Sequence, residues 1–286
     1  MKPQERIAIV TDSTSDLPAD LLARFGIHVV PLYVLWGGQE LRDGVDIDRA
    51  TLYARLRQDP EHPKTSQPTP ADFLNAIRQV DAPEVLVLTI SSALSGTYNS
   101  ACQARELTAT PVHVEDSRVT SMALGWQVLA AARAREEGAD LEGMLAAARR
   151  VRAGVVTRFT VDTLEYLRRG GRIGGAAWMI GTALQLKPVL SLDPQTGQVE
   201  SLERIRSRRR AVQNLVERAA EEFGSVPAPH VAVMHAMAPE EAEALREELT
   251  ARLHPREILA TELTPVLGIH GGPGLLGFCA YADAAR

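Results

Sequence analysis

The chain has 286 residues, 45% of them hydrophobic and 23% charged, a balance typical of a soluble globular protein with one large domain or two ordinary ones. Its net charge of −5 at pH 7 argues against a general nucleic-acid-binding protein. No stretch reaches the roughly 18 apolar residues of a membrane-spanning helix, and the charged N-terminal segment lacks the apolar core of a signal peptide. These features predict a cytoplasmic protein. Cys102 and Cys279 form no Cys-x-x-Cys pair and are interpreted as buried small hydrophobic residues.

Strands and helices alternate in the first half of the sequence. The apolar run at residues 7–10 is typical of a buried parallel strand, and a helix capped by Ser15 or Asp16 and ended by Gly26 is expected after it. Further strands are predicted at residues 27–35, 84–90 and 111–114. Further helices are predicted at residues 49–57, 71–80, 97–107, 121–137 and 141–151. This alternation predicts a parallel sheet covered by helices, in a Rossmann-like α/β domain over residues 1–153.

The pattern changes after residue 153. Asp193-Pro194 and Gly197 indicate a turn, so strands at residues 186–192 and 199–205 are expected to form a hairpin. The remaining elements are predicted as strands at 155–161, 230–235, 257–263 and 275–282 and helices at 208–223 and 239–253. We therefore predict an α/β protein of two domains, the second being an α+β domain with a mixed or antiparallel sheet over residues 154–286.

Several common catalytic motifs do not occur in the sequence. There is no G-x-x-x-x-G-K-[ST] phosphate loop, no H-E-x-x-H zinc helix and no G-x-S-x-G nucleophile elbow. Residues 272–277 match G-x-G-x-x-G, but only about ten residues follow them, too few for a dinucleotide-binding βαβ unit. We predict no metal site, no cofactor and no catalytic residue.

The first candidate segment, residues 64–73, leads into a predicted helix. Its prolines keep the preceding residues extended, and Thr69 or Asp72 can cap the helix. The simple interpretation is a helix-entry loop. In either interpretation, the hydroxyls of Thr65 and Ser66 are free to face a ligand.

The second candidate segment, residues 89–101, lies where the third predicted strand ends and a helix begins. Ligands bind at this edge of open parallel sheets. Ser95 is expected to be the N-cap of the helix, and Gly96 allows another group to approach the backbone closely. Capping leaves the hydroxyl proton of Ser95 free, and the first-turn amides favour an anion. The segment is therefore compatible with both a helix cap and an anion site.

Two further segments leave a structural and a functional interpretation open. Glycines surround His270 in residues 268–274, which indicates a tight backbone path rather than a regular element. Arginines concentrate in residues 167–175, and the same half of the chain adds Arg204, Arg206, Arg208, Arg209 and Arg210. These arginines fit either a solvated basic face or a site for a phosphorylated ligand or an acidic partner.

Six segments in this order resemble the DegV family over residues 6–282. They include the opening strand and loop at residues 9–18 and the second strand at residues 31–34. The other four are Lys64-Thr65-Ser66-Gln67-Pro68, Leu94-Ser95-Gly96-Thr97-Tyr98-Asn99-Ser100-Ala101, Arg169-Gly170-Gly171-Arg172-Ile173 and His270-Gly271-Gly272-Pro273-Gly274. Each motif is weak alone, but their order across the chain is specific.

The resemblance implies a protein that holds a long-chain fatty acid, such as palmitate or another C16–C18 acid, in a tunnel between two domains. It implies that Thr65 and Ser95 bind the carboxylate with His270 in the same hydrogen-bond network, and that Arg172 lies near the pocket mouth. Ser66, Ser92 and Gly96 are secondary candidates.

The resemblance also implies a partner. Several family members carry the acyl chain for an ATP-binding fatty acid kinase subunit, whose acyl phosphate product enters phospholipid synthesis. The chain itself would then be no enzyme, and it would contact the membrane only transiently, for lipid exchange.

Physical chemistry is compatible with that interpretation. Burying about 14 methylenes at roughly 0.8 kcal/mol each contributes on the order of 11 kcal/mol before ordering costs. The carboxylate then needs hydrogen-bond donors, because an unpaired charge in an apolar site is costly. Two alternatives stay open: a lipid carrier or sensor without a kinase partner, and a serine hydrolase that uses Ser95 with His270 and an acid such as Asp12.

Overall fold

The computed structural model describes residues 7–59, 61–179 and 186–283, and its first half contains the predicted parallel sheet. All neighbouring strands in this sheet are parallel, in the order β2-β1-β6-β7. The strands are β1 (Ile7–Asp12), β2 (Ile27–Val30), β6 (Glu84–Thr89) and β7 (Val112–Asp116). Every residue of β1 is buried, as expected for a strand with both faces covered.

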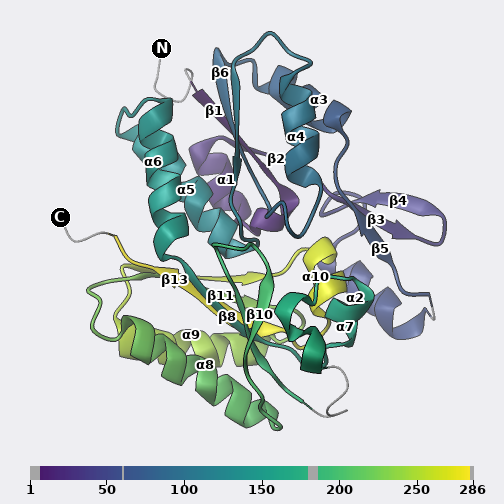
Figure 1. Cartoon of the computed structure of the whole chain (residues 1–286), viewed down its shortest axis with the longest axis vertical. Coiled ribbons are helices and arrows are strands. Elements are labelled where there is room, and N and C mark those ends of the chain that lie inside the picture. The colour runs from purple at the N-terminus through teal and green to yellow at the C-terminus, as the bar shows by residue number, and fades with distance from the viewer. Residues whose placement is uncertain (1–6, 60, 180–185, 284–286) are drawn as a thin grey trace.

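Helices cover both faces of this sheet (Figure 1). They are α1 (Ala19–Phe25), α3 (Pro70–Val80), α4 (Thr97–Arg105), α5 (Met122–Glu136) and α6 (Leu141–Gly154). Because side chains alternate along a strand, Val10 packs in the core under α3 and α4, whereas Ile9 packs in the core under α5. Together with the second sheet described below, this arrangement confirms the predicted α/β fold class.

One predicted strand is wrong. Residues 27–35 do not form a single strand, because Pro31 lacks an amide hydrogen and β2 ends before it. The chain then enters a separate antiparallel sheet with the order β4-β3-β5. Its strands are β3 (Tyr33–Trp36), β4 (Gln39–Arg42) and β5 (Lys64–Ser66), with helix α2 (Arg49–Gln58) between the last two. The segment interpreted as a helix-entry loop therefore begins as an edge strand.

The start of the first helix also differs from the prediction. Asp12 caps a short 3-10 turn, η2 (Ser13–Ser15), and α1 begins only after Pro18. Asp16 has a left-handed backbone with φ 52° and does not cap α1. Its carboxylate instead accepts hydrogen bonds from the Ser121 hydroxyl and the Thr264 amide. The predicted end of the helix at Gly26 is confirmed.

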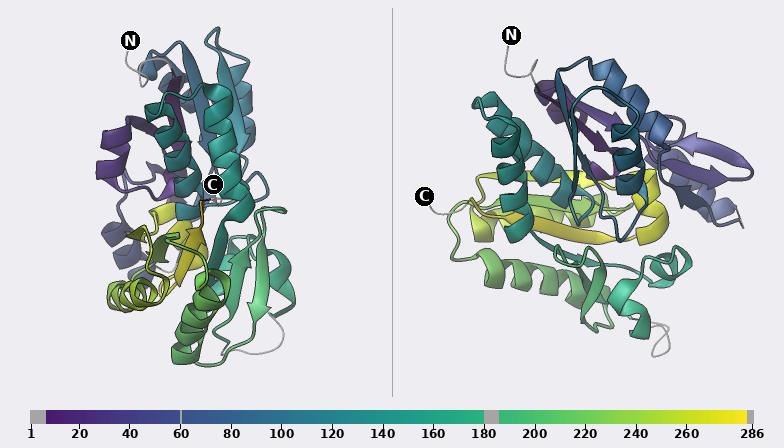
Figure 2. Two further views of the ribbon diagram at one scale, coloured as in Figure 1. Left: turned by 90° about the vertical axis from the view of Figure 1, so that its left-hand side faces the viewer. Right: turned by 45° about the horizontal axis from the view of Figure 1, so that its top comes forward.

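The second half contains a mixed six-stranded sheet with the order β10-β9-β8-β13-β11-β12. Only the β11–β12 pair is parallel, and β9 and β10 form the predicted hairpin. The strands are β8 (Val156–Thr160), β9 (Val189–Leu192), β10 (Val199–Glu203), β11 (His230–His235), β12 (Glu257–Glu262) and β13 (Leu276–Tyr281). Helices α8 (Arg208–Phe223) and α9 (Pro239–Leu253) cover its outer face, as Figure 2 shows. The boundary near residue 153 stays a prediction.

The inner face of this sheet turns toward the first half of the chain (Figure 1). Leu190, Met234 and Cys279 on that face share one apolar core with Trp126 of α5. Helices α7 (Glu165–Arg169) and α10 (Pro265–Gly271) and the 3-10 helix η3 (Gly174–Met179) complete this half. No helix in the described ranges is long and apolar enough to cross a bilayer.

Two smaller predictions need correction. The glycine-rich segment around His270 was expected to be irregular, but residues 265–271 form α10, which ends at Gly272 with φ 75°. Pro265 suits the first helical position. Tyr53 and Leu275 occupy the space that Cβ atoms at positions 268 and 271 would need, so glycine fits at both positions. Both cysteines are free thiols, but only Cys279 is buried, whereas Cys102 is half-buried.

Candidate ligand-binding site

A pocket lies between the two halves of the chain. It encloses about 960 Å³ of empty space, a volume that includes the part open to solvent. Most of its wall is apolar: Leu32, Ile90, Leu94, Phe159, Leu167, Leu192, Val199, Met234, Leu263, Val266, Leu267 and Leu275. The loops after β2 and β6 in the first half, and strands of the mixed sheet with α7 and α10 in the second half, supply most of these side chains. The pocket therefore exists only when the halves are packed together.

The three main candidates all line this pocket. Thr65 on β5 and His270 on α10 are 205 residues apart in sequence, and Thr65 Oγ1 lies 2.8 Å from His270 Nε2 in a hydrogen bond. Ser95 comes from the loop between β6 and α4. The structure thus places the hydroxyls of Thr65 and Ser95 and the imidazole of His270 in the wall of one pocket.

Ser95, which was the predicted N-cap of this helix, lies one position before the observed cap. The N-cap of α4 is Gly96, while Ser95 Oγ accepts a hydrogen bond from the Thr97 amide at 3.3 Å and lies 2.8 Å from Thr97 Oγ1. Gly96, a secondary candidate, is not among the residues that line the described pocket. Instead it makes room for Gln67, since a Cβ at position 96 would lie 3.0 Å from the Gln67 amide group.

His270 is held as a neutral imidazole. Burial lowers its pKa to about 4, and the positive charges of Arg172 and His62 act in the same direction. At neutral pH the ring therefore carries one proton, and the nitrogen that carries it sets the direction of the bond to Thr65. The other nitrogen, Nδ1, is buried and has no hydrogen-bond partner among the described residues.

Gly170 forms the floor beneath this imidazole. A Cβ at position 170 would lie 2.0 Å from His270 Nδ1, so only glycine lets the backbone of the α7 end approach the ring so closely. Arg172 follows two residues later and lines the pocket. Its Nε donates to the Leu94 carbonyl at 2.9 Å and its Nη1 to the Gly170 carbonyl at 2.6 Å. The guanidinium thus connects the backbone at Gly170, beside the His270 ring, to the loop that carries Ser95.

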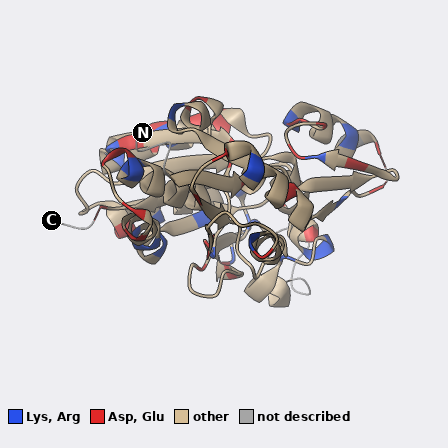
Figure 3. Cartoon of the chain, turned by 90° about the horizontal axis from the view of Figure 1, so that it is seen from above, with Lys and Arg blue, Asp and Glu red and all other residues tan. Residues whose placement is uncertain are grey.

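Most of the other clustered arginines form surface ion pairs. Arg168 and Arg169 both bind Glu165 and lower the pKa of that carboxyl group to about 2. Arg208 pairs with Glu241 and Arg210 with Glu217. Figure 3 shows basic and acidic positions interspersed along the outer elements. These pairs favour the interpretation as a solvated basic face, and of the clustered arginines Arg172 alone lines the pocket described.

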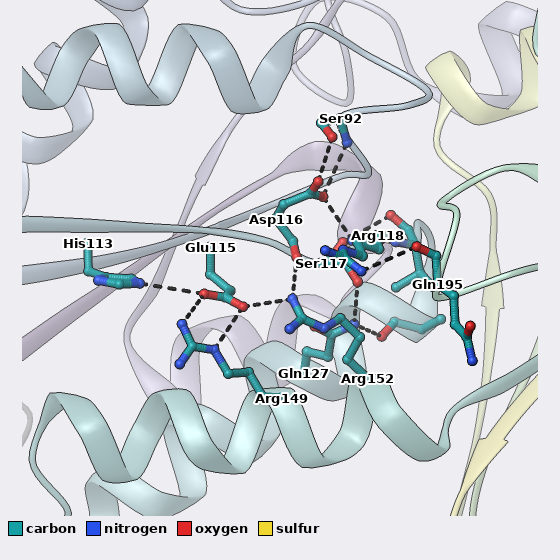
Figure 4. Close-up of polar contacts among 12 residues, drawn as sticks. Ser92, His113, Glu115, Asp116, Ser117, Arg118, Gln127, Arg149, Arg152 and Gln195 are labelled. Atoms are coloured by element: carbon teal, nitrogen blue, oxygen red, sulfur yellow. Dashed lines mark hydrogen bonds and ion pairs between the residues drawn. The ribbon is translucent and has the colours of Figure 1, made fainter.

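The secondary candidates separate into two groups. Ser66 lines the pocket beside Thr65. Ser92 does not line it, and its Oγ donates to Asp116 Oδ2 at 2.6 Å (Figure 4). Asp116 also accepts from the amides of Ser92 and Arg118, so Ser92 fastens the loop that carries Ser95 to the end of β7.

The same loop is tied to the β9–β10 turn. Ser91 Oγ donates to the Gly197 carbonyl at 2.9 Å. From the neighbouring loop after β7, the Arg118 guanidinium donates to the Gln195 carbonyl at 3.2 Å (Figure 4). A Cβ at Gly197 would lie 2.2 Å from Ser91 Oγ, so this contact needs glycine. These bonds hold the loops after β6 and β7 against the β9–β10 turn, next to the pocket residues Leu94 and Leu192 in sequence.

The hydrolase alternative finds no assembled triad in the described residues. Ser95 bonds with Thr97 and His270 with Thr65, so the nucleophile and the base do not contact each other. Asp12 is buried and accepts hydrogen bonds from Thr14 and the Ile90 amide instead of orienting the imidazole. This geometry does not support acyl transfer by Ser95.

Sequence reasoning missed most of the pocket wall. Thr120, Ser121 and Thr157 also line it, together with the apolar residues named above. No motif indicates these positions, because apolar strand residues that face a cavity have the same pattern as those that face a packed core. No group of three or more His, Cys, Asp or Glu in the described part of the chain could hold a metal ion.

The fold and the pocket define a class: an α/β protein with a parallel and a mixed sheet and a mostly apolar pocket between its two halves, in which Thr65 and His270 are hydrogen-bonded. A family model described as "Uncharacterised protein, DegV family" matches residues 6–283. A DegV domain-containing protein of Streptomyces coelicolor is 40% identical over 275 residues, 95% of this chain and 96% of that protein. The chain belongs to the DegV family, as its sequence motifs indicate.

Two solved structures show the same fold. One, described as fatty acid binding of a DegV family protein from Thermus thermophilus, has a TM-score of 0.92 and 40% identity, covering 97% of this chain and 100% of that one. The other, DegV from Bacillus subtilis, described as a fatty acid binding protein, has a TM-score of 0.90 and 31% identity, covering 98% of this chain and 100% of that one.

Proposed function

We propose that this protein binds a long-chain fatty acid, of the C16–C18 class that includes palmitate, in the pocket between its halves. Thr65 and Ser95 hold the carboxylate, with His270 in the same hydrogen-bond network. The observation that carries this proposal is the Thr65–His270 pair at 2.8 Å, one polar site in an otherwise mostly apolar wall. The fatty acids bound by the two similar proteins support the same ligand class.

The polarity of the site suits a carboxylate that stays reactive. Hydroxyl and neutral imidazole donors satisfy the oxygens without the full neutralisation of a buried ion pair. Arg172 adds positive charge at the mouth, and it is exposed to solvent, so its attraction is screened. Ser66 is a secondary contact for the same head group.

We further propose that the chain presents this carboxylate to a separate ATP-binding kinase subunit. A carboxylate oxygen would attack the γ-phosphorus of ATP, ADP would leave, and the acyl phosphate would enter phospholipid synthesis. In this scheme the chain is not itself an enzyme, works in the cytoplasm and contacts the membrane only while it exchanges lipid. A carrier or sensor without a kinase partner is the second candidate, because the same pocket serves it equally.

The lipid content of the purified protein tests the first proposal. Native mass spectrometry is expected to find the protein with one C16–C18 fatty acid retained, because methylene burial of about 11 kcal/mol slows its release. Organic extraction should then return the free acid. A protein that carries no lipid and binds none after incubation with palmitate would contradict the proposal.

Reconstitution with a kinase subunit distinguishes the proposed kinase-subunit role from the carrier role. The loaded protein, a cognate ATP-binding subunit and ATP are expected to yield acyl phosphate, trapped as the hydroxamate. Each component omitted in turn should abolish the product. If no cognate subunit forms it while fatty acid binding persists, the kinase role is rejected and the carrier role stands.

A further inference from the structure

Helix α10 carries His270 but is a poor helix by itself. It has seven residues, it begins with Pro265, and two of its residues are glycines. Isolated helices this short do not form in water, and glycine is a weaker helix former than alanine. Its own N-cap residue, Thr264, makes no side-chain capping bond. The helix that places the imidazole therefore depends on contacts from outside.

Two buried aspartates of the first half supply those contacts. Asp16 Oδ1 accepts the amide of Thr264 at 2.8 Å, and Asp43 Oδ1 accepts the amide of Val266 at 3.2 Å. Their relative exposures are 3% and 2%. Between these two donors lies Pro265, which has no amide hydrogen. The carboxylates thus act as N-caps supplied across the interface, where the helix dipole favours negative charge.

Asp16 also bonds to a residue of the pocket wall. Its Oδ2 accepts from Ser121 Oγ at 2.5 Å, and Ser121 lines the pocket wall. Both residues have positive φ, 52° for Asp16 and 54° for Ser121. A non-glycine residue in such a conformation is strained and persists only where its surroundings hold it. One side chain therefore ties the pocket wall to the start of α10.

We propose that Asp16 and Asp43 are positioning residues that fix α10, and with it His270, against Thr65 at the head-group end of the pocket. The proposal rests on the proposed function, because it assigns these aspartates to the same fatty-acid site. This role is assigned to a residue of the opening motif, residues 9–18, in which Asp16 follows the end of β1. Arg49 supports the same segment by donating to the carbonyls of Glu262 and Leu263 at 2.9 and 3.2 Å.

A third aspartate provides a matched control. Asp12 is fully buried, and burial raises its pKa to about 6, as it raises those of Asp43 to about 6 and Asp16 to about 7. Its hydrogen bonds go only to Thr14 and the Ile90 amide, within the first half. Asp12 therefore shares the desolvation of the other two carboxyl groups, but among the described residues it has no hydrogen bond to α10.

The test compares three variants of the ligand-free protein by NMR titration of His270. In Asp16→Ala, the apparent pKa of His270 is expected to rise from about 4 toward the ordinary value of about 6.5, because the loosened helix exposes the ring. Palmitate affinity should fall by about 10-fold, the scale of one lost buried hydrogen bond. Asp16→Asn keeps an acceptor for Thr264 and tolerates positive φ, so it should restore both values.

The control decides between positioning and general stability. Asp12→Ala is expected to lower Tm as much as Asp16→Ala while the His270 pKa stays near 4. If Asp16→Ala only lowers Tm and leaves the His270 pKa and the palmitate affinity unchanged, the proposal is overturned. Should Asp16→Ala fail to fold, Asp43→Ala repeats the test from the other aspartate. The His270 titration needs no ligand, so a protein that binds no palmitate would refute the proposed function and leave this readout intact.

Discussion

Replacing Thr65 and Ser95 together with alanine is expected to lower the affinity for palmitate by on the order of 100-fold or more. A hydrogen bond to a charged group contributes about 1.5–3 kcal/mol, and the double variant removes two such donors from one carboxylate. The fold should persist, since Thr65 lies on an edge strand and Ser95 in a loop. Titration calorimetry on delipidated protein measures the affinity, and thermal unfolding checks the fold.

Ser92→Ala is the matched control for that pair. Ser92 lies three residues before Ser95 in the same loop, but its hydroxyl donates to Asp116 rather than into the pocket. Its loss is expected to lower Tm slightly and to leave palmitate affinity within about twofold. A double variant with unchanged affinity would remove Thr65 and Ser95 from the head-group site, whatever the control does.

The sequence predicted the regular elements best where the pattern is long and local. The bounds of α8, β11 and α9 match the prediction, because amphipathic repeats and clear turns mark them. It failed at α10 and at β5, where tertiary contacts decide. Glycine-rich residues 265–271 form a helix because two aspartates more than 200 positions away cap it, and no local rule contains that information.

The candidate site was predictable in unequal parts. Ser95 could be placed at the edge of a parallel sheet from the strand pattern and the turn that follows. The pairing of Thr65 with His270 needed the family motifs, because the two residues meet only when the antiparallel sheet and α10 pack together. Closeness in sequence to a site residue did not predict the position of Ser92. It lies only three positions from Ser95, but its hydroxyl bonds to Asp116.

Gly170, in the arginine-rich segment 167–175, leaves room for the His270 ring, a role that the sequence analysis did not assign to it. Gly170→Ala is expected to lower palmitate affinity by about 10- to 100-fold, because the added methyl would lie 2.0 Å from His270 Nδ1 and must displace the ring from Thr65. Backbone strain does not contribute, since Gly170 has φ −73°, which alanine adopts freely. The effect would therefore act on the imidazole alone.

NMR titration of His270 identifies this cause. In the unmodified protein the ring is expected to titrate near pH 4, because burial and the charge of Arg172 disfavour its protonated form. A ring displaced into solvent by Gly170→Ala should titrate closer to 6.5 and gain its charge as the pH falls through that value. Gly154→Ala is the control, since nothing lies within 4 Å of the Cβ that it adds. If Gly170→Ala binds palmitate normally with a His270 pKa still near 4, the ring is not held by this close contact, and His270 needs another account.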